Sequence, residues 1–417
     1  MKLTGRGEKI FFSQWISFFL LLSVGFNKYS VTIAGFSLRL YMAALLFGTA
    51  FAFLSVRQIT PLLPFEKALF VFFLLYMLSC IRIENLEFGL TTIISCMLTV
   101  AFYFICRIYF GQLSLFTLER LISVSGIIVS VVSLITYILG FVHVNFNYRN
   151  IGRVSTAGVL FELGTPRLYG TVSFDPNVAA AVFLIFVCYY LFHLNGMTHK
   201  IGLCLSITCL MLTISRSGFI AFFLGLFVCI MVPYYERIII TVRRPGKSQR
   251  LLLIIGVTIL IIPITFFCVR SNYIMLLLNR FRSLLTDHGT GRIDLWKYAL
   301  QGWIKNPIWG IGGGYGPRYM AGLRNMDFNV HNTWIEVLLE TGVIGFLGIL
   351  IFIILLFKQC CNVSTYKYSN RFVMAVLVSV LFIMSTISLQ RNEILYLVCA
   401  IIYRYSIETQ SIQENGA

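Results

Sequence analysis

The stretch TWIEVLLETGVIGFLGILIFIILLF, residues 333–357, decides the structural class of this chain. As one helix, these residues would extend about 37 Å, whereas the hydrocarbon core of a bilayer is about 30 Å thick. The stretch carries only two charged side chains, Glu336 and Glu340, and both lie in its first third. It therefore predicts a membrane-spanning helix whose first turns protrude from the hydrocarbon core.

The rest of the chain has the same character. Its 417 residues are 58% hydrophobic and only 12% charged, too apolar for a single soluble core. Apolar runs close to the roughly 20 residues of a spanning helix recur from Phe11 almost to the C-terminus, whereas barrel strands would be about 10 residues long and alternating. We therefore predict an all-α, polytopic transmembrane helical bundle that forms a single integral membrane domain over residues 1–417.

About twelve spans are predicted, at 11–26, 38–56, 66–81, 88–106, 120–142, 176–194, 200–214, 217–235, 251–268, 333–357, 372–389 and 394–405. Lys2, Arg6 and Lys9 precede the first span, and no small-x-small cleavage site follows it, which predicts a retained span with a cytoplasmic N-terminus. In this topology the lysines and arginines of the short connections gather on the cytoplasmic side, most strongly at 237–250.

Two long extracytoplasmic loops, 143–175 and 269–332, follow from this topology. Long loops are more often functional than filler, so we expect the work of the protein there. Both loops carry more arginine and lysine than acidic residues. An anionic ligand would explain this excess, and a basic face resting on anionic lipid is the alternative. None of the eleven cysteines lies in either loop, so no disulfide framework is implied.

Three stretches contain candidate site residues, and the first is the turn 213–218. A single helix over 201–235 would extend about 52 Å, so the chain must turn here and leave Arg216 at the outer tip. An arginine at the membrane edge presents a fork of donors suited to diphosphate oxygens. A snorkelling or capping arginine is the plainer alternative.

The second stretch runs from Gly289 to Gly316. Helical spacing over 292–304 predicts a short amphipathic helix on the membrane surface, ended by Asn306-Pro307. Its apolar face would carry Ile293, Trp296, Leu300 and Trp303. The glycines of 310–316 let the backbone approach a ligand or form tight turns, and without a preceding strand they do not indicate a nucleotide fold.

The third stretch is 330–342. Glu336 and Glu340 lie four residues apart on one helix face at the membrane boundary, where each carboxylate needs a partner, and Arg216 or Arg292 is the partner we expect. His331 lies beside them, where an imidazole can accept a proton from a sugar hydroxyl, although a structural histidine is the alternative. The spacing of the remaining histidines resembles no metal site, so we predict no metal.

Together these stretches resemble the O-antigen polymerase and O-antigen ligase superfamily. The resemblance rests on Asn306-Pro307, Gly310-Ile311-Gly312, His331-Asn332 with Glu336, Glu340-Thr341-Gly342, Ser215–Gly218 and Phe174–Asn177, and it covers about a quarter of the chain. It implies an inverting, metal-independent glycosyltransferase, without a cofactor, that uses an undecaprenyl diphosphate-linked glycan as donor. It further implies that Arg216 and Arg292 hold the diphosphate and that His331 acts as the base or positions the acceptor. The predicted substrate contacts are Arg167, Asn332, Glu336 and Glu340.

Two members of this superfamily fit the sequence almost equally. A polymerase joins lipid-linked repeat units, whereas a ligase transfers the glycan to the lipid A core. We favour the polymerase, because two basic loops suit two diphosphate-bearing substrates. A polysaccharide flippase or transporter is a further alternative, although the chain lacks the matching halves typical of transporters.

The resemblance places the chain in lipopolysaccharide biosynthesis. It implies a bacterial inner membrane protein whose active site faces the periplasm. The expected partners are the glycan donor, the glycan acceptor and membrane lipids, with a chain-length regulator as a further candidate and no nucleic acid.

Overall fold

The computed structural model of the chain describes residues 4–33, 36–55, 60–83, 86–148, 152–162, 164–239, 292–324 and 329–415. The chain divides into two compact units. The larger comprises Met1–Cys229 and Asp294–Ala417, and the smaller comprises Ile230–Ile293. The following description concerns the larger unit unless the smaller is named.

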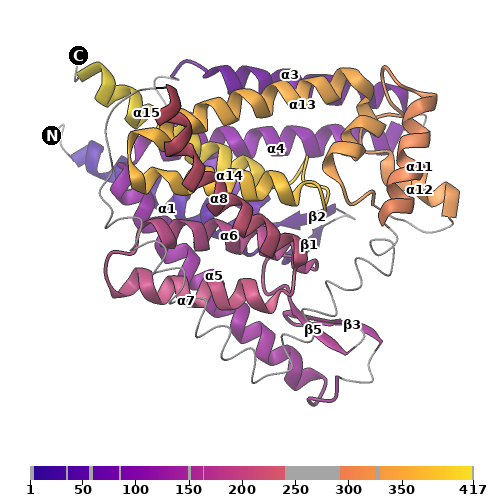
Figure 1. Cartoon of the computed structure of the whole chain (residues 1–417), viewed down its shortest axis with the longest axis horizontal. Helices are drawn as coiled ribbons and strands as arrows, with labels where there is room; N and C mark the ends of the chain where they lie inside the picture. The colour runs from indigo at the N-terminus through magenta and orange to yellow at the C-terminus, as the bar shows by residue number, and fades with distance from the viewer. Residues whose placement is uncertain are drawn as a thin grey trace. The chain divides into compact units, whose positions relative to one another are not determined.

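The described chain is mostly helical (Figure 1). The helices are α1 (Thr4–Gly25), α2 (Leu40–Ser55), α3 (Pro64–Ser79), α4 (Leu86–Gln112), α5 (Leu115–His143), α6 (Pro176–Phe192), α7 (Met197–Leu212), α8 (Arg216–Ile239), α11 (Arg292–Lys305), α12 (Gly316–Arg324), α13 (Thr333–Tyr366), α14 (Arg371–Ile383) and α15 (Glu393–Asn415), with 3-10 turns at Cys80–Arg82 (η1) and Tyr368–Asn370 (η2). Local chemistry sets several starts: Pro64 and Pro176 occupy the first turn of their helices, and Ser114 caps α5.

The predicted spans fall on helices, except that 251–268 lies outside the described residues. Among the described helices, four are long and apolar enough to cross a membrane: Pro64–Arg82, Glu87–Gln112, Leu115–His143 and Thr333–Thr365. Shorter apolar helices occupy most of the other predicted positions. The transmembrane character of the bundle is thereby supported, and the count of about twelve spans stays a prediction.

Two small antiparallel sheets were not predicted by the all-α assignment. Strand β1 (Ser30–Ile33) pairs with β2 (Phe36–Arg39), and a second sheet has the order β3 (Arg153–Thr156), β4 (Val159–Glu162), β5 (Thr165–Leu168). In the second sheet Val159 lies opposite Leu168, and both are fully buried. Within the segment predicted as the loop 143–175, the described residues therefore include a sheet, whose strand β4 packs against α5 and whose strand β5 packs against α6 and α7.

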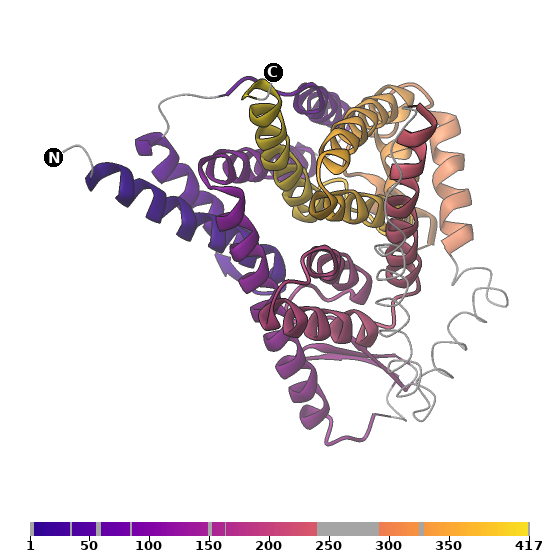
Figure 2. The ribbon, with the colours of Figure 1, turned by 60° about the vertical axis from the view of Figure 1, so that its left-hand side comes forward.

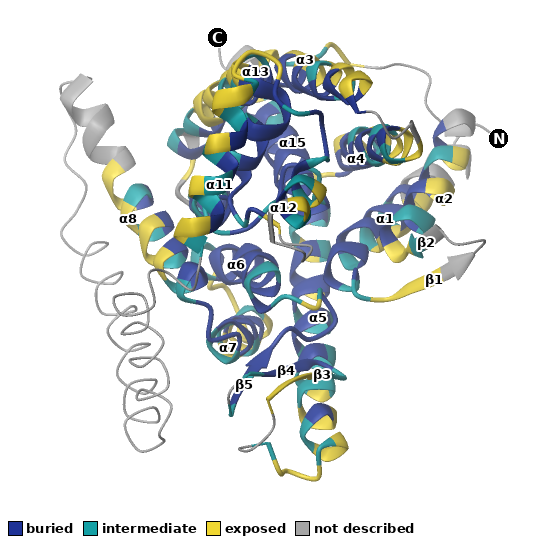
Figure 3. Cartoon of the chain, turned by 90° about the vertical axis from the view of Figure 1, so that its right-hand side faces the viewer, coloured by how far each residue is buried: buried dark blue, intermediate teal, exposed yellow. Residues whose placement is uncertain are grey.

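The bundle is built around two helices that are buried over most of their length. Helix α15 packs against α4, α13 and α14, and α6 packs against α7 and α14. A helix that is apolar on all sides belongs in an interior, and Figure 3 shows both helices mostly in the buried colour. Figure 2 gives a second view of the same helices. The short final span predicted at 394–405 is thus an interior helix.

The connections between helices meet at two opposite ends of the bundle (Figure 1). At one end, Thr171 donates to the Gly25 carbonyl at 2.7 Å, and Thr333 accepts from the Leu389 amide at 2.9 Å. At the other, Arg404 donates to the Leu113 carbonyl at 2.8 Å. The connections predicted as external share the first end, called here the loop end. Which side of a membrane it faces stays a prediction.

Helix α13 is interrupted at Gly342, which has a left-handed φ of +63°. The segment after α11 supplies hydrogen bonds to the interrupted backbone: Ile311 and Gly312 donate to the carbonyls of Leu339 and Glu340, and Val343 donates to the Pro307 carbonyl, each at 2.9 Å. In a bilayer, a broken helix needs such internal partners. The prediction of one uninterrupted helix over 333–357 is therefore wrong at this point.

We expect Gly342→Ala to destabilise the folded protein by roughly 1–3 kcal/mol, because a Cβ there would overlap the Ile308 carbonyl and disfavour the left-handed backbone. Thermal unfolding in detergent measures the change. Gly322→Ala in α12 is the matched control, because a Cβ at Gly322 meets open space. Equal midpoints for the two variants would contradict this account of the helix break.

Candidate active site

The turn between α7 and α8 brings together Arg167, Asn177 and Ser215. Ile214 has a left-handed φ of +48°, which lets the chain reverse within a few residues. The Ser215 hydroxyl donates to Asn177 Oδ1 at 2.8 Å, and Arg167 Nε donates to the Thr213 carbonyl at 3.2 Å. Arg167 thus links β5 by a hydrogen bond to the turn that precedes α8. Two predicted site residues, Arg167 and Arg216, therefore belong to the same local structure.

Arg167 has further partners within the protein. Its guanidinium donates to Glu162 Oε2 at 3.3 Å and to Asn177 Oδ1 at 3.4 Å, and only 9% of the residue is exposed. This geometry makes Arg167 a support for the turn. Its predicted contact with the substrate stays a prediction.

His331 lies immediately before the first turn of α13. Its φ is +53°, a left-handed conformation that few residues other than glycine adopt. Asn332 follows as the helix cap, and its side chain accepts from the amides of Trp334 and Ile335 at 3.0 and 3.2 Å. The cap fixes the backbone beside His331 at a helix N-terminus, where the peptide dipoles favour negative charge. The predicted substrate contact Asn332 therefore has a structural role.

The contacts of helix α14 show how far along the bundle Arg216 and His331 each lie. This helix packs antiparallel against α8: Ser379 donates to the Ala221 carbonyl at 2.9 Å, Gly225 lies against the Ala375 carbonyl, and Cys229 donates to the Arg371 carbonyl at 3.2 Å. Arg216 lies five residues before Ala221 in α8, and the corresponding step along antiparallel α14 leads from Ser379 to its C-terminal end. Arg216 is therefore level with that end. At that end Ser385 accepts from the indole of Trp334 at 3.1 Å. Two of the predicted catalytic residues therefore lie at the same level, at the loop end.

Arg292 is the first residue of α11 and falls in the smaller unit, so its predicted role beside Arg216 stays a prediction. The helix that it begins exists as predicted, but the side that is buried in the protein differs from the predicted apolar face, whose contact with the membrane surface stays a prediction. Leu295, Ala299 and Gly302 are the buried residues of α11, whereas Ile293 is 40% exposed. The small residues Ala299 and Gly302 explain the difference, because they let α11 approach α12 and α13 closely.

Glu336 and Glu340 are both buried in α13, and the prediction of Arg216 or Arg292 as their partner is wrong. Glu340 accepts from the Gly316 amide at 3.0 Å and from the Tyr76 hydroxyl. Glu336 accepts from the Gln390 amide at 2.7 Å and from the Ser388 hydroxyl. These neighbours enclose both carboxylates in protein, and their predicted contact with substrate stays a prediction.

Sequence reasoning missed the contribution of residues 385–392 to this region. The predicted span 372–389 ends within the largely polar sequence Ser388-Leu389-Gln390-Arg391-Asn392, whereas α14 already ends at Ile383. That run of polar residues within an apolar segment was the available signal. Tyr76 carried no signal, because a tyrosine inside an apolar helix is unremarkable in sequence.

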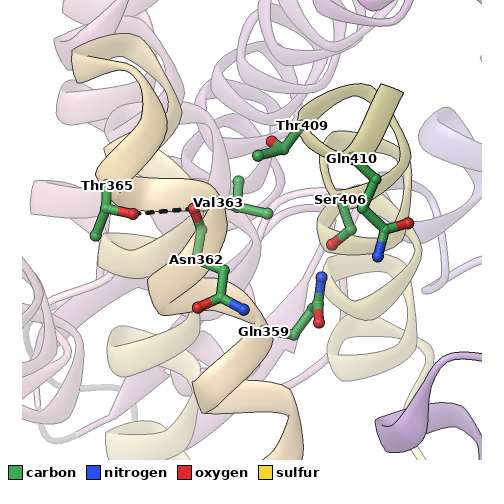
Figure 4. Close-up of a pocket in the computed structure, with 7 residues that line it drawn as sticks. All are labelled: Gln359, Asn362, Val363, Thr365, Ser406, Thr409 and Gln410. Carbon is green, nitrogen blue, oxygen red and sulfur yellow. Dashed lines mark hydrogen bonds between the residues drawn. The ribbon is translucent and has the colours of Figure 1, made fainter. Parts of the chain in front are cut away.

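A pocket of about 310 Å³ lies between α13 and α15, away from all these residues (Figure 4). Hydroxyl and amide side chains line it, including those of Gln359, Ser406 and Gln410. None of the predicted site residues is among its lining residues. Within the described ranges no group of three or more His, Cys, Asp or Glu residues could hold a metal ion. Metal independence nevertheless stays a prediction.

We expect Asn332→Ala to cost about 1 kcal/mol of stability and to speed amide exchange at 333–336, because two cap hydrogen bonds are lost. Hydrogen–deuterium exchange of the purified protein measures this. Ser114→Ala removes the cap of α5 and serves as control, since it should leave exchange at 333–336 unchanged. Unchanged exchange there in Asn332→Ala would show that the cap does not fix this turn.

The chain was compared with known proteins. The family model described as O-antigen ligase matches residues 201–350, from α7 into α13. No curated protein matches the chain. The matched segment contains Arg216, Arg292 and His331, the residues on which the predicted chemistry depends. Over this segment, which is 150 of the 417 residues, the match supports the resemblance to the O-antigen polymerase and ligase superfamily.

Proposed function

We propose that the chain is an O-antigen polymerase that joins undecaprenyl diphosphate-linked repeat units on the periplasmic face of the inner membrane. One observation carries the proposal: Arg216 and His331 lie at the same level at the loop end, within the segment that matches the family. A transferase needs a cation beside the leaving group and a base beside the attacking group on one side of the membrane. The shared level of Arg216 and His331 supports assigning these two roles to them.

The proposed reaction is a single displacement at the anomeric carbon of the donor. A hydroxyl of the acceptor glycan attacks this carbon, the bond from the carbon to the diphosphate oxygen breaks, and the diphosphate leaves with the electron pair. Attack from the opposite face inverts the configuration. His331 accepts the proton of the attacking hydroxyl, a contribution of roughly 10²–10⁴ in rate.

Arg216 stabilises the diphosphate as its charge develops, and Arg292 is proposed as a second cation. A guanidinium fork matches two phosphate oxygens, which allows catalysis without a metal. The support for Arg216 is its position at the N-terminus of α8, where backbone N–H groups also favour an anion. The left-handed backbone of His331 and the Asn332 cap preorganise the base.

The choice of polymerase over ligase depends on surface charge at the loop end. Arg153 in β3 and Arg318 in α12 are exposed residues of the two basic segments. Two basic segments suit two diphosphate-bearing substrates, whereas a ligase needs one such donor and the lipid A core. The shared level of Arg216 and His331 does not favour a flippase, which would need polar groups along a path through the bilayer.

We expect His331→Ala and Arg216→Lys to lower polymer formation by about 10²-fold or more, because one removes the base and the other the bidentate fork. Gel analysis of surface polysaccharide, with membrane levels of each variant, measures the effect. The matched controls are His143→Ala and Arg82→Lys, both exposed residues of the loop end. Polymer of normal length in His331→Ala would remove this mechanism.

The glycan of a deletion strain distinguishes the candidate functions. A lipid A core carrying a single repeat unit is the result expected for a lost polymerase. Bare core together with polymer on the lipid carrier would instead indicate a ligase. Single repeat units retained on the carrier at the cytoplasmic face would indicate a flippase.

A further inference from the structure

A buried group of polar side chains lies about two and a half helical turns beyond His331, beneath the loop end. Tyr76 of α3 donates to the Glu340 carboxylate and accepts from the Gly314 amide at 3.2 Å. The Gly316 amide donates to the same carboxylate at 3.0 Å. Glu340 and Tyr76 are fully buried, so this hydrogen-bonded group belongs to the interior of the protein.

Arg391 is the cation beside this group. Its guanidinium carbon lies 5.9 Å from the centroid of the Tyr76 ring, and a guanidinium nitrogen lies beside Gly314. Burial disfavours its charge, yet the pKa of Arg391 is raised because Tyr76, Glu340 and Glu336 lie nearby. Among these described residues, Arg391 makes no ion pair within 4.0 Å to Glu336 or Glu340, so its charge acts on these two buried carboxyl groups at longer range. Removing it would leave them without this nearby cation, and buried charge without a counter-charge is strongly destabilising.

The connection between α14 and α15 that carries Arg391 also forms hydrogen bonds with the first turns of α13. The Thr333 amide donates to the Met384 carbonyl at 2.7 Å, and its hydroxyl donates to the Ile387 carbonyl at 2.8 Å. Ser388 and Gln390 donate to Glu336 one turn later. The connection is itself fixed to α4, because Thr99 donates to the Arg391 carbonyl at 3.3 Å.

We propose that Arg391 is a positioning residue for the transfer site. By compensating the charges of Glu336 and Glu340, it keeps the 384–391 connection against α13 and so fixes His331 at the helix start. This inference rests on the proposed role of His331. Arg391 lies beyond residue 350, so the site would depend on a part of the chain outside the family match.

The opposite end of the bundle offers a control in which a buried arginine is paired directly with a buried carboxylate. There Arg107 and Tyr103 of α4 donate to the buried carboxylate of Glu66, the tyrosine at 2.6 Å. Arg107 also donates to the carbonyls of Thr60 and Pro61 at 3.0 Å. Removing Arg107 therefore also leaves a buried carboxylate without its arginine, but at the end remote from His331.

The test uses the full-length chain in lipid nanodiscs. Arg391→Gln should speed amide exchange over 333–341 and lower kcat by about 10²-fold, with little change in KM, because the base is misplaced while the binding arginines remain.

Three further variants serve as controls. Arg391→Lys, which keeps the charge, should retain more activity than Arg391→Gln. The double variant Arg391→Gln with Glu340→Gln should recover part of both losses, since it removes a charge together with its counter-charge. Arg107→Gln should speed exchange near 60–66 and leave 333–341 as in the wild type.

Several outcomes would overturn the proposal. One is wild-type exchange over 333–341 in Arg391→Gln, and another is a double variant no better than the single one. A raised KM with unchanged kcat would instead mean that Arg391 contacts the substrate. If the wild-type chain transfers no glycan, the proposed function fails, while the exchange measurements still decide whether Arg391 positions α13.

Discussion

The buried carboxylate of Glu340, next to the break in α13, is the constraint on which the loop end depends. Polar groups at this depth need partners from within the protein, because lipid supplies none. The segment after α11 returns to α13 and satisfies both the interrupted backbone and the carboxylate. Gly310, Gly312 and Gly314 take left-handed conformations on this path. The glycine-rich sequence thus fits the close packing of this path: a Cβ at Gly310 would overlap the Glu340 backbone of α13, one at Gly312 the Ile83 side chain, and one at Gly314 the Thr92 side chain of α4.

The geometry of the candidate site follows from this packing. The returning segment continues from α11, whose buried face packs with α12 and the first turns of α13. The connection after α14 holds the same turns from another side. His331 is therefore placed by contacts from distant parts of the sequence. Arg216 reaches the same level through a separate route, the turn supported by Arg167 and Asn177.

The sequence was sufficient for features that depend on local composition. The apolar runs in the sequence located the helices. Because successive spans were assigned opposite directions, the sequence also predicted which connections lie together at one end of the bundle. Arg216 and His331 could be selected because each follows or precedes a long apolar run at that end.

Features that depend on contacts between distant residues could not be predicted. Glu340 lies 264 positions from its partner Tyr76, and no periodicity records such a pairing. The strands β3, β4 and β5 have only four residues each, too short for an alternating pattern to stand out. The face of α11 was assigned from its large apolar residues, whereas its small residues determine which side packs closely.

The central claim is that the loop end carries the site and faces the periplasm. Phe174, at the loop end, is 61% exposed, and Phe116, at the other end, is 75% exposed. The most direct measurement is labelling of Phe174→Cys and Phe116→Cys, in intact spheroplasts, by a thiol reagent that cannot cross membranes, with the unmodified chain as background. The account predicts that Phe174→Cys is labelled at once and Phe116→Cys only after the membrane is permeabilised. The reverse pattern would place the site in the cytoplasm and contradict the account.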